Sequence, residues 1–134
     1  MRAFFFLAFL LTAMICKSQN PLTSTIRWTA DRATDLKTNN DFAFQCVFQT
    51  NENSVEWIQK SGSFVQHFNV TSTDGTWNDV QQAGEITFHV SHNGQTGTVV
   101  AKRTSAGVSI TVDFTGSNSY APKHEFRINQ VTEN

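Results

Sequence analysis

The segment from 84 to 114 alternates apolar and polar residues in three runs that are separated by short turn sequences. Alternation with a period of two is typical of β-strands that bury one face. The first turn contains Asn93-Gly94, the pair that best supplies the two positive φ angles of a type I′ turn. A two-residue loop at this position sets Phe88 opposite Val99, so that apolar side chains meet across the strands.

The second turn, a two-residue Ser105-Ala106 loop followed by a glycine, pairs Val99 with Val112 and keeps the same face apolar. Turn chemistry and hydrophobic pattern therefore agree on a three-stranded antiparallel meander.

The same alternation recurs along the rest of the chain and predicts five further strands. The expected strands lie near residues 24–30, 42–50, 55–60, 64–71, 85–92, 96–104, 108–114 and 124–131. Two segments interrupt the alternation. Residues 31–41 are predicted to form a loop that can hold one helical turn, and residues 73–84 contain a short helix candidate that Gly84 would end.

Eight sequential antiparallel strands, each with one apolar face, would leave two exposed edges in an open sheet. Closure into an up-and-down β-barrel removes both edges. We therefore predict an all-β domain closed as an eight-stranded barrel, with a two-sheet β-sandwich as the alternative.

Short connections fix how neighbouring strands face one another. Loops at 51–54 and around Ser61-Gly62 set Phe48 opposite Trp57, Trp57 opposite Gln66 and Val55 opposite Phe68. The same parity directs Cys46, Gln59 and Gln66 inward, with Cys46 across from Gln59.

Polar groups on an apolar inner face need a partner, because an unpaired buried polar group costs about 1 to 3 kcal/mol. One interpretation is that they orient a small apolar ligand inside the barrel. The other is that Gln59 and Gln66 lie at the mouth in contact with water. The predicted ligand-contacting residues are Trp28, Cys46, Phe48, Trp57, Gln59, Gln66, Phe68 and Phe88.

Two histidines, His67 and His89, are predicted on the outer face. If Phe68 pairs with Phe88, they become cross-strand neighbours that could hold a metal ion. The residue paired with His89 on the following strand is Thr98, so a third ligand is missing. Solvated histidines are the better interpretation, and we expect no metal site.

Trp77 lies outside the strand pattern, after the turn sequence Asp74-Gly75. It can close one end of the barrel or contact a partner, and burial is favoured because large aromatic residues outside strands usually still bury most of their surface.

The N-terminus has the form of a signal peptide: a basic start, an apolar run from Ala3 to Ile15 and small residues before an expected cut after Ser18. Residues 1–18 would then be removed, and residues 19–134 would form a single domain in a secreted or periplasmic protein. The alternative is a lipid anchor on Cys16, although Ile15 is bulky for that kind of signal.

The remaining chemistry excludes several classes of function. The mature chain carries eight basic and eleven acidic residues, a net charge of −3, which makes nucleic acid an improbable partner. Cys46 is the one mature cysteine, so no intramolecular disulfide can form. No catalytic, phosphate-binding or cofactor signature is present, and the carboxylates are scattered. We expect no cofactor and no enzymatic activity.

An exported eight-stranded meander with a tryptophan in its first strand resembles the lipocalin-like small-molecule binders. The family marks this strand with Gly-x-Trp; Trp28 matches, whereas Ile26 stands where the glycine would be. In the family a basic residue covers the tryptophan, and the resemblance implies this role for Arg127. The chain is shorter than the usual member and lacks the cysteines that often hold the family's tail.

Two functions follow as hypotheses. The first is a non-enzymatic exported protein that carries a small apolar ligand in a lipocalin-like barrel. The second is an extracytoplasmic interaction module that binds a protein or glycan through its outer surface, at threonine-rich outward positions and Trp77. No membrane span is expected, because the N-terminal apolar run is too short.

Overall fold

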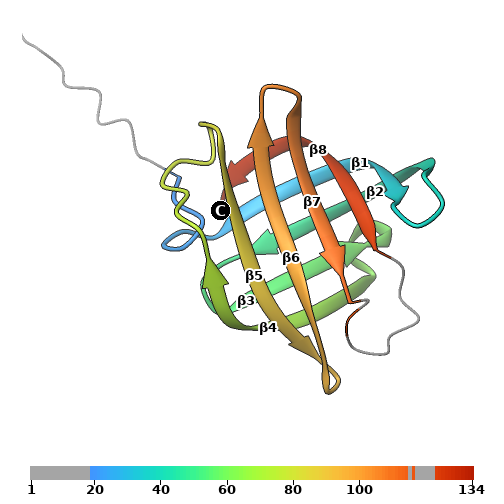
Figure 1. The fold of residues 1–134 in the computed structure, drawn as a ribbon, viewed down its shortest axis with the longest axis horizontal. Helices are drawn as coiled ribbons and strands as arrows, with labels where there is room; N and C mark the ends of the chain where they lie inside the picture. The colour runs from blue at the N-terminus through green and yellow to red at the C-terminus, as the bar shows by residue number, and fades with distance from the viewer. Residues whose placement is uncertain (1–18, 115, 117–122) are drawn as a thin grey trace, which may run out of the picture.

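Eight antiparallel strands, each hydrogen-bonded to the next and the last to the first, close into an up-and-down barrel (Figure 1). The computed structural model describes residues 19–114, 116 and 123–134, so the expected signal peptide and Cys16 lie outside the described residues, as does most of the loop that precedes the last strand. The strands are β1 (Ile26–Asp35), β2 (Asn40–Thr50), β3 (Ser54–Gln59), β4 (Phe64–Asp74), β5 (Gly84–His92), β6 (Gln95–Thr104), β7 (Gly107–Asp113) and β8 (His124–Glu133). The predicted barrel is confirmed, and the sandwich alternative is wrong.

Most predicted strand registers are confirmed where a short turn joins the two strands. Phe88 pairs with Val99, and Val99 pairs with Val112. The first of these hairpins turns at Asn93-Gly94, with φ angles of 50° and 76°. Both angles are positive, as a type I′ turn requires.

On the other side of the barrel, β3 carries the residues that were predicted to face inward. Trp57 pairs with Phe48 on β2 and with Gln66 on β4, and Gln59 pairs with Cys46. A 3₁₀ turn, η1 (Lys60–Gly62), joins β3 to β4.

β1 is longer than predicted because a β-bulge interrupts its alternation. Against β8 the register moves from Ala30 opposite Ile128 to Arg32 opposite Arg127, which leaves Asp31 as an extra residue. Ala33 therefore returns to the inner face, where it is 1% exposed. The predicted loop at 31–41 is wrong over most of its length: β1 continues to Asp35 and a turn at 36–39 leads into β2.

A second bulge, at Thr71, changes the register between β4 and β5. Val70 pairs with Val90, but beyond the bulge Phe88 pairs with Thr73. Phe68 is not paired with Phe88, so the condition under which His67 and His89 would be cross-strand neighbours is not met.

The predicted helix at 73–84 is wrong. β4 runs to Asp74, and residues 75–83 form an irregular loop. Gly84 does not end a helix; it makes room for a side chain, because a Cβ atom there would lie 2.2 Å from Cδ1 of Trp77. The loop is therefore positioned by the packing of its tryptophan.

This loop closes one end of the barrel, which we call the closed end. Trp77 is 2% exposed, packs with its ring centroid 5.7 Å from that of Trp28, and donates a 2.9 Å hydrogen bond from its indole to the carbonyl of Gln82. Arg103 on β6 donates to the carbonyl of Val80 at 2.7 Å. Trp77 thus acts as the lid that we predicted, and the alternative of a partner-contacting Trp77 is wrong.

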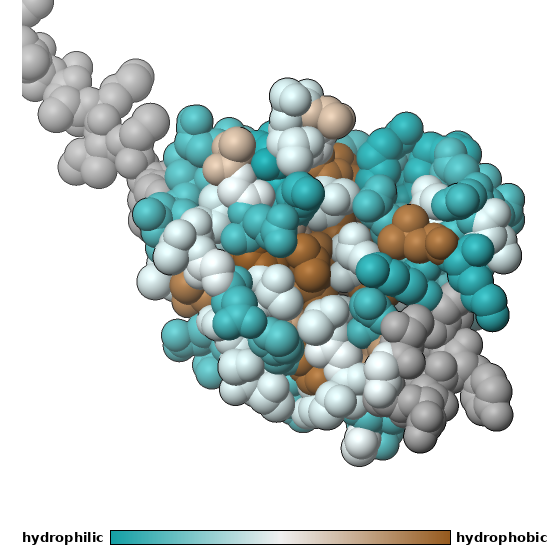
Figure 2. Space-filling model, viewed as in Figure 1, coloured by the Kyte–Doolittle hydropathy of each residue, from teal (hydrophilic) through white to brown (hydrophobic). Residues whose placement is uncertain are grey.

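The outer surface is mainly polar. On the face shown in Figure 2, hydrophilic residues predominate and apolar residues are visible between them. The exposed large hydrophobic residues of the described chain are Phe64 and Val65, which are 46% and 49% exposed and adjacent at the start of β4.

Candidate functional site

The exposure of inward-facing side chains changes along the barrel. On β2, Phe48 is fully buried, whereas Phe44 and Phe42, toward the other end of the strand, are half-buried. β3 shows the same change, from buried Val55 to half-buried Gln59. The accessible part of these two inner faces therefore lies at the end opposite the Trp77 lid, which we call the aromatic end.

The closed half of the barrel is filled by its own side chains. Trp28, Phe48 and Phe88 each have a relative exposure of 0%. These rings have no contact with solvent, as expected for an eight-stranded barrel that packs its interior. The Trp28 indole is also satisfied, since it donates a 2.9 Å hydrogen bond to the hydroxyl of Thr50.

At the aromatic end, Trp57 is held by three phenylalanine rings. It stacks on Phe48 with centroids 5.7 Å apart and planes 8° apart. Phe126 meets it edge-on at 5.3 Å, and Phe44 is tilted at 6.3 Å. Stacked and edge-on arrangements are the favourable geometries for aromatic pairs. Trp57 is therefore a firmly held but partly exposed surface.

Further rings surround this surface. Phe42 meets Phe44 nearly perpendicularly at 6.2 Å, and His124 from β8 lies edge-on to Phe42 at 6.2 Å. Phe64, at the start of β4, belongs to the same inner face and is the most exposed of these residues. We define the aromatic mouth as the inward residues Phe42, Phe44, Trp57, Gln59, Phe64, Gln66 and His124.

The polar groups of the mouth are without protein partners. The indole nitrogen of Trp57 is shielded from water and has no hydrogen-bond acceptor. Gln66 lies directly opposite Trp57, and Gln59 lies two residues further along β3. Within the described chain neither glutamine side chain forms a hydrogen bond. The two primary amides can therefore bond to a molecule from outside, whereas the shielded indole N–H can do so only if the Trp57 ring moves.

Cys46 adds no reactivity to the mouth. Burial raises the pKa of its thiol to about 11, and the neighbouring Trp57 side chain only partly opposes that rise. The thiol lies close to the indole without the geometry of a hydrogen bond. A thiol with this pKa is protonated at neutral pH and is a poor nucleophile.

The structure divides the eight predicted contact residues into two groups. Trp28, Cys46, Phe48, Phe68 and Phe88 are buried, with exposures of at most 5%. Trp57, Gln59 and Gln66 are half-buried in the mouth. Direct contact with a ligand is thus open to the second group, while the side chains of the first group are covered by the rest of the protein.

Four mouth residues were absent from that prediction: Phe42, Phe44, Phe64 and His124. The parity of the alternation placed the three phenylalanines on the inner face, and their position near strand ends was visible in the sequence. What the sequence did not show is that Trp77 closes one barrel end, while the described inward side chains near the opposite strand ends stay partly exposed. Without this asymmetry, strand-end residues cannot be distinguished from packed ones.

The outer histidines are engaged in separate polar contacts. His89 meets the carboxylate of Asp74 at 2.5 Å, whereas His67 lies 3.6 Å from Glu56 and 3.2 Å from Asn69. Among the residues described, no group of three histidine, cysteine or carboxylate side chains is arranged to hold a metal ion.

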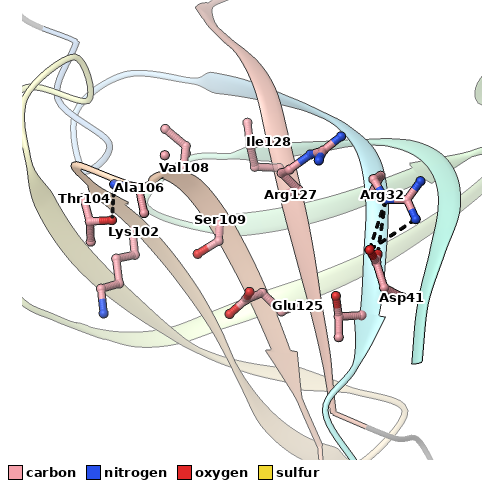
Figure 3. A pocket seen from close by; sticks show the side chains of 12 residues that line it. Arg32, Asp41, Lys102, Thr104, Ala106, Val108, Ser109, Glu125, Arg127 and Ile128 are labelled. Carbon is pink, nitrogen blue, oxygen red and sulfur yellow. Dashed lines mark hydrogen bonds and ion pairs between the residues drawn. The ribbon is translucent and has the colours of Figure 1, made fainter. Parts of the chain in front are cut away.

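An outer groove crosses β6, β7, β8 and β1, and Figure 3 shows its side chains. Arg127 was expected to cover Trp28, but it points outward and donates two hydrogen bonds, at 3.1 and 2.7 Å, to Asp31 in the β1 bulge. This bond lowers the pKa of the Asp31 carboxyl. Arg32, which is the cross-strand neighbour of Arg127 on β1, forms an ion pair with Asp41 at 3.2 Å. The positive charge of each arginine is compensated by a carboxylate of the protein itself. The two arginines therefore do not make the groove a binding site for anions.

Comparisons with known proteins leave the chain without an assigned family: no protein-family model matches it, and neither a curated protein nor a solved structure does. Within the described residues, no helix has the length and apolar character needed to cross a membrane. The likeness to lipocalin-like proteins is one of architecture, an all-antiparallel eight-stranded closed barrel.

Proposed function

We propose that the protein is an exported, non-enzymatic binding protein that takes a small apolar ligand at its aromatic mouth. The observation that carries this proposal is the contrast between the two barrel ends. The inward rings of the closed half are inaccessible, whereas Phe42, Phe44 and Trp57 are half-buried and Phe64 is 46% exposed. Partly exposed aromatic rings with a few polar groups between them are typical of small-molecule sites.

The expected affinity is moderate. A two-ring ligand that removes about 250 Å² of apolar surface from water gains roughly 6 kcal/mol. Loss of the ligand's translational and rotational freedom offsets part of this gain, and each aromatic pair formed adds about 0.5 to 1.5 kcal/mol. With two or three aromatic pairs and a cost of at least about 4 kcal/mol for the lost freedom, about 5 kcal/mol remains, so dissociation constants on the order of 0.1 mM are expected.

The chemistry of the mouth favours binding over catalysis. Its polar groups are an indole, two amides and an imidazole, and the nearby Cys46 thiol is protonated at neutral pH. An activated nucleophile would need an adjacent base or a lowered pKa, and Cys46 shows the opposite shift.

The alternative, an interaction module that uses the outer surface, rests on a different observation. Val47, Ile58 and Val65 are cross-strand neighbours on the outer face of β2, β3 and β4. They form a short apolar row, and Val65 is 49% exposed. A protein partner would be expected to cover this row.

The test is titration of the mature protein with N-phenyl-1-naphthylamine, a neutral probe whose fluorescence rises in apolar sites. We expect saturable binding that Phe44→Ala weakens about tenfold, because one aromatic wall is lost. Val65→Ala, on the outer row, should leave binding unchanged. Absence of probe binding to folded protein would overturn the proposal, and loss of binding in Val65→Ala alone would favour the outer surface.

Export is tested separately by mass spectrometry of protein recovered from its host. We expect a soluble chain that begins at Gln19. A chain that begins at Cys16 with a diacylglycerol attached would replace the soluble form with a lipid-anchored one.

A further inference from the structure

We propose that the ligand is a planar, uncharged molecule with an oxygen hydrogen-bond acceptor, such as an aryl ketone, aryl amide or phenol. This inference rests on the proposed function and specifies the chemistry of the same site. It combines three observations about the aromatic mouth: the shape of its walls, its unpartnered polar groups and its lack of charged side chains.

The walls select flat molecules. Five of the seven mouth residues are planar rings, and the ring pairs meet at steep angles, 84° between Phe42 and Phe44 and 85° between Phe42 and His124. Walls at such angles offer one guest both a ring face and a ring edge. An aromatic guest can use both contacts, whereas a flexible alkyl chain gains only area.

The unpartnered donors select an acceptor atom. A buried donor without a partner is unfavourable, and the Trp57 indole nitrogen is such a donor. It is shielded in the unliganded barrel, so the proposed contact requires a small rotation of the Trp57 ring, against its packing on Phe44, Phe48 and Phe126, that brings this N–H to a ligand oxygen. The free-energy gain is then the difference between an unpaired and a paired N–H, which a plain hydrocarbon cannot provide.

The two glutamines provide contacts next to this donor. Gln66 is the cross-strand partner of Trp57, and Gln59 follows on the same inner face. Each amide offers N–H donors and a carbonyl acceptor. The three groups can therefore bind one ligand oxygen and, for a phenol, its proton as well.

Charge is disfavoured at this position. None of the seven mouth residues is an Asp, Glu, Lys or Arg: besides the imidazole of His124 they are three phenylalanine rings, an indole and two amides. A carboxylate or ammonium group placed among these rings would lose hydration without gaining a charged partner from the mouth. The uncharged form of a ligand should bind best.

The experiment compares three probes that share one ring system: naphthalene, 2-acetylnaphthalene and 2-naphthoate. Each displaces N-phenyl-1-naphthylamine from the mature protein. The ketone should bind about tenfold more tightly than naphthalene, because one hydrogen bond contributes roughly 1.4 kcal/mol. The carboxylate should bind more weakly than the ketone.

Two variants remove the proposed donors while keeping the walls. Trp57→Phe keeps an aromatic ring and removes the N–H, and Gln66→Leu removes the amide. Each should reduce the preference for the ketone several-fold, measured as the ratio of ketone to naphthalene affinity within the same variant. The matched control is Gln45→Leu, an exposed outward residue of β2 whose loss should change neither affinity.

The outcomes separate this inference from the proposed function. If the fluorescent probe binds but wild-type protein binds ketone and hydrocarbon equally, the inference is wrong and the proposed function stands. Tighter binding of the carboxylate than of the ketone overturns the uncharged class. If none of the probes binds to folded protein, the proposed function itself fails. Should Trp57→Phe fold poorly, Gln66→Leu and the wild-type preference still decide the question.

Discussion

The bond between Trp28 and Thr50 gives the sharpest test of how the closed half is stabilised. Both residues are 0% exposed, and the indole N–H donates to the threonine hydroxyl at 2.9 Å. Thr50→Val keeps the side-chain shape and removes the acceptor. The indole N–H is then buried without a partner.

The expected loss of stability follows from that orphaned donor. An unsatisfied buried N–H costs about 1 to 3 kcal/mol, and the added methyl group recovers part of this through its own burial, up to about 0.8 kcal/mol. We therefore expect Thr50→Val to lower the free energy of unfolding by about 1.5 kcal/mol, which corresponds to a fall in Tm of roughly 6 °C.

Urea denaturation followed by circular dichroism measures the change, with Thr111→Val as the matched control on the outer face of β7, where Thr111 is only half-buried. A double-mutant cycle with Trp28→Phe isolates the bond: in that background Thr50→Val should cost little, because no indole remains. Equal costs in both backgrounds, or an unchanged urea midpoint in the single variant, would refute the reasoning.

Three further predictions concern packing, the hairpin and the buried thiol. Gly84→Ala should destabilise the protein by about 2 kcal/mol or more on the scale of overpacked cores, measured by urea unfolding, because its Cβ would overlap the Trp77 ring; the loss should shrink in Trp77→Leu. Gly94→Val should cost about 1 to 2 kcal/mol, because φ is 76° and nothing lies near the new side chain, so that an unchanged urea midpoint would contradict the assigned turn. Because burial raises the pKa of Cys46 from 9.0 to about 11, the unfolded thiol ionises first as pH rises; stability should fall between these two pH values, and the fall should be smaller in Cys46→Val. A wild type and a variant with the same pH profile would show that the thiol is not buried in solution.

Local turn chemistry explains why so much of the fold could be predicted from the sequence. Asn93-Gly94 fixes its hairpin by itself, and the alternation on either side agrees with the register that this turn imposes. The β2–β3 and β3–β4 registers could be predicted in the same way from short loops. Where a short turn joins two strands, the alternation of apolar and polar residues and the geometry of the turn specify the same strand register.

The errors in the extent and register of the strands occur where a bulge breaks the alternation. Asp31 is an extra residue against β8 and Thr71 is one against β5, and each shifts the parity of the residues after it in its strand. In the sequence, a strand with one extra residue shows the same break in apolar and polar alternation as two shorter strands that are separated by a loop. Such positions depend on contacts across the barrel, for example the bond from Arg127 to Asp31, which neighbouring residues do not reveal.

The candidate site was accessible from the sequence only in part. Parity placed Trp57, Gln59 and Gln66 on the inner face, and that placement is confirmed by their pairing. How far these three side chains lie from the open ends of the strands, and hence how exposed they are, could not be predicted. It depends on Trp77 filling the opposite end, which in turn depends on the space left by Gly84.

The indole N–H signals of the three tryptophans test the central claim most directly. In a ¹⁵N-edited NMR spectrum each tryptophan gives one indole signal, and Trp28→Phe, Trp57→Phe and Trp77→Phe assign them. Titration with 2-acetylnaphthalene should shift the Trp57 signal strongly and leave those of Trp28 and Trp77 nearly unchanged, because the latter two are buried at the closed end. A shift of the Trp28 or Trp77 signal with no change at Trp57 would contradict the assignment of the aromatic mouth as the binding site.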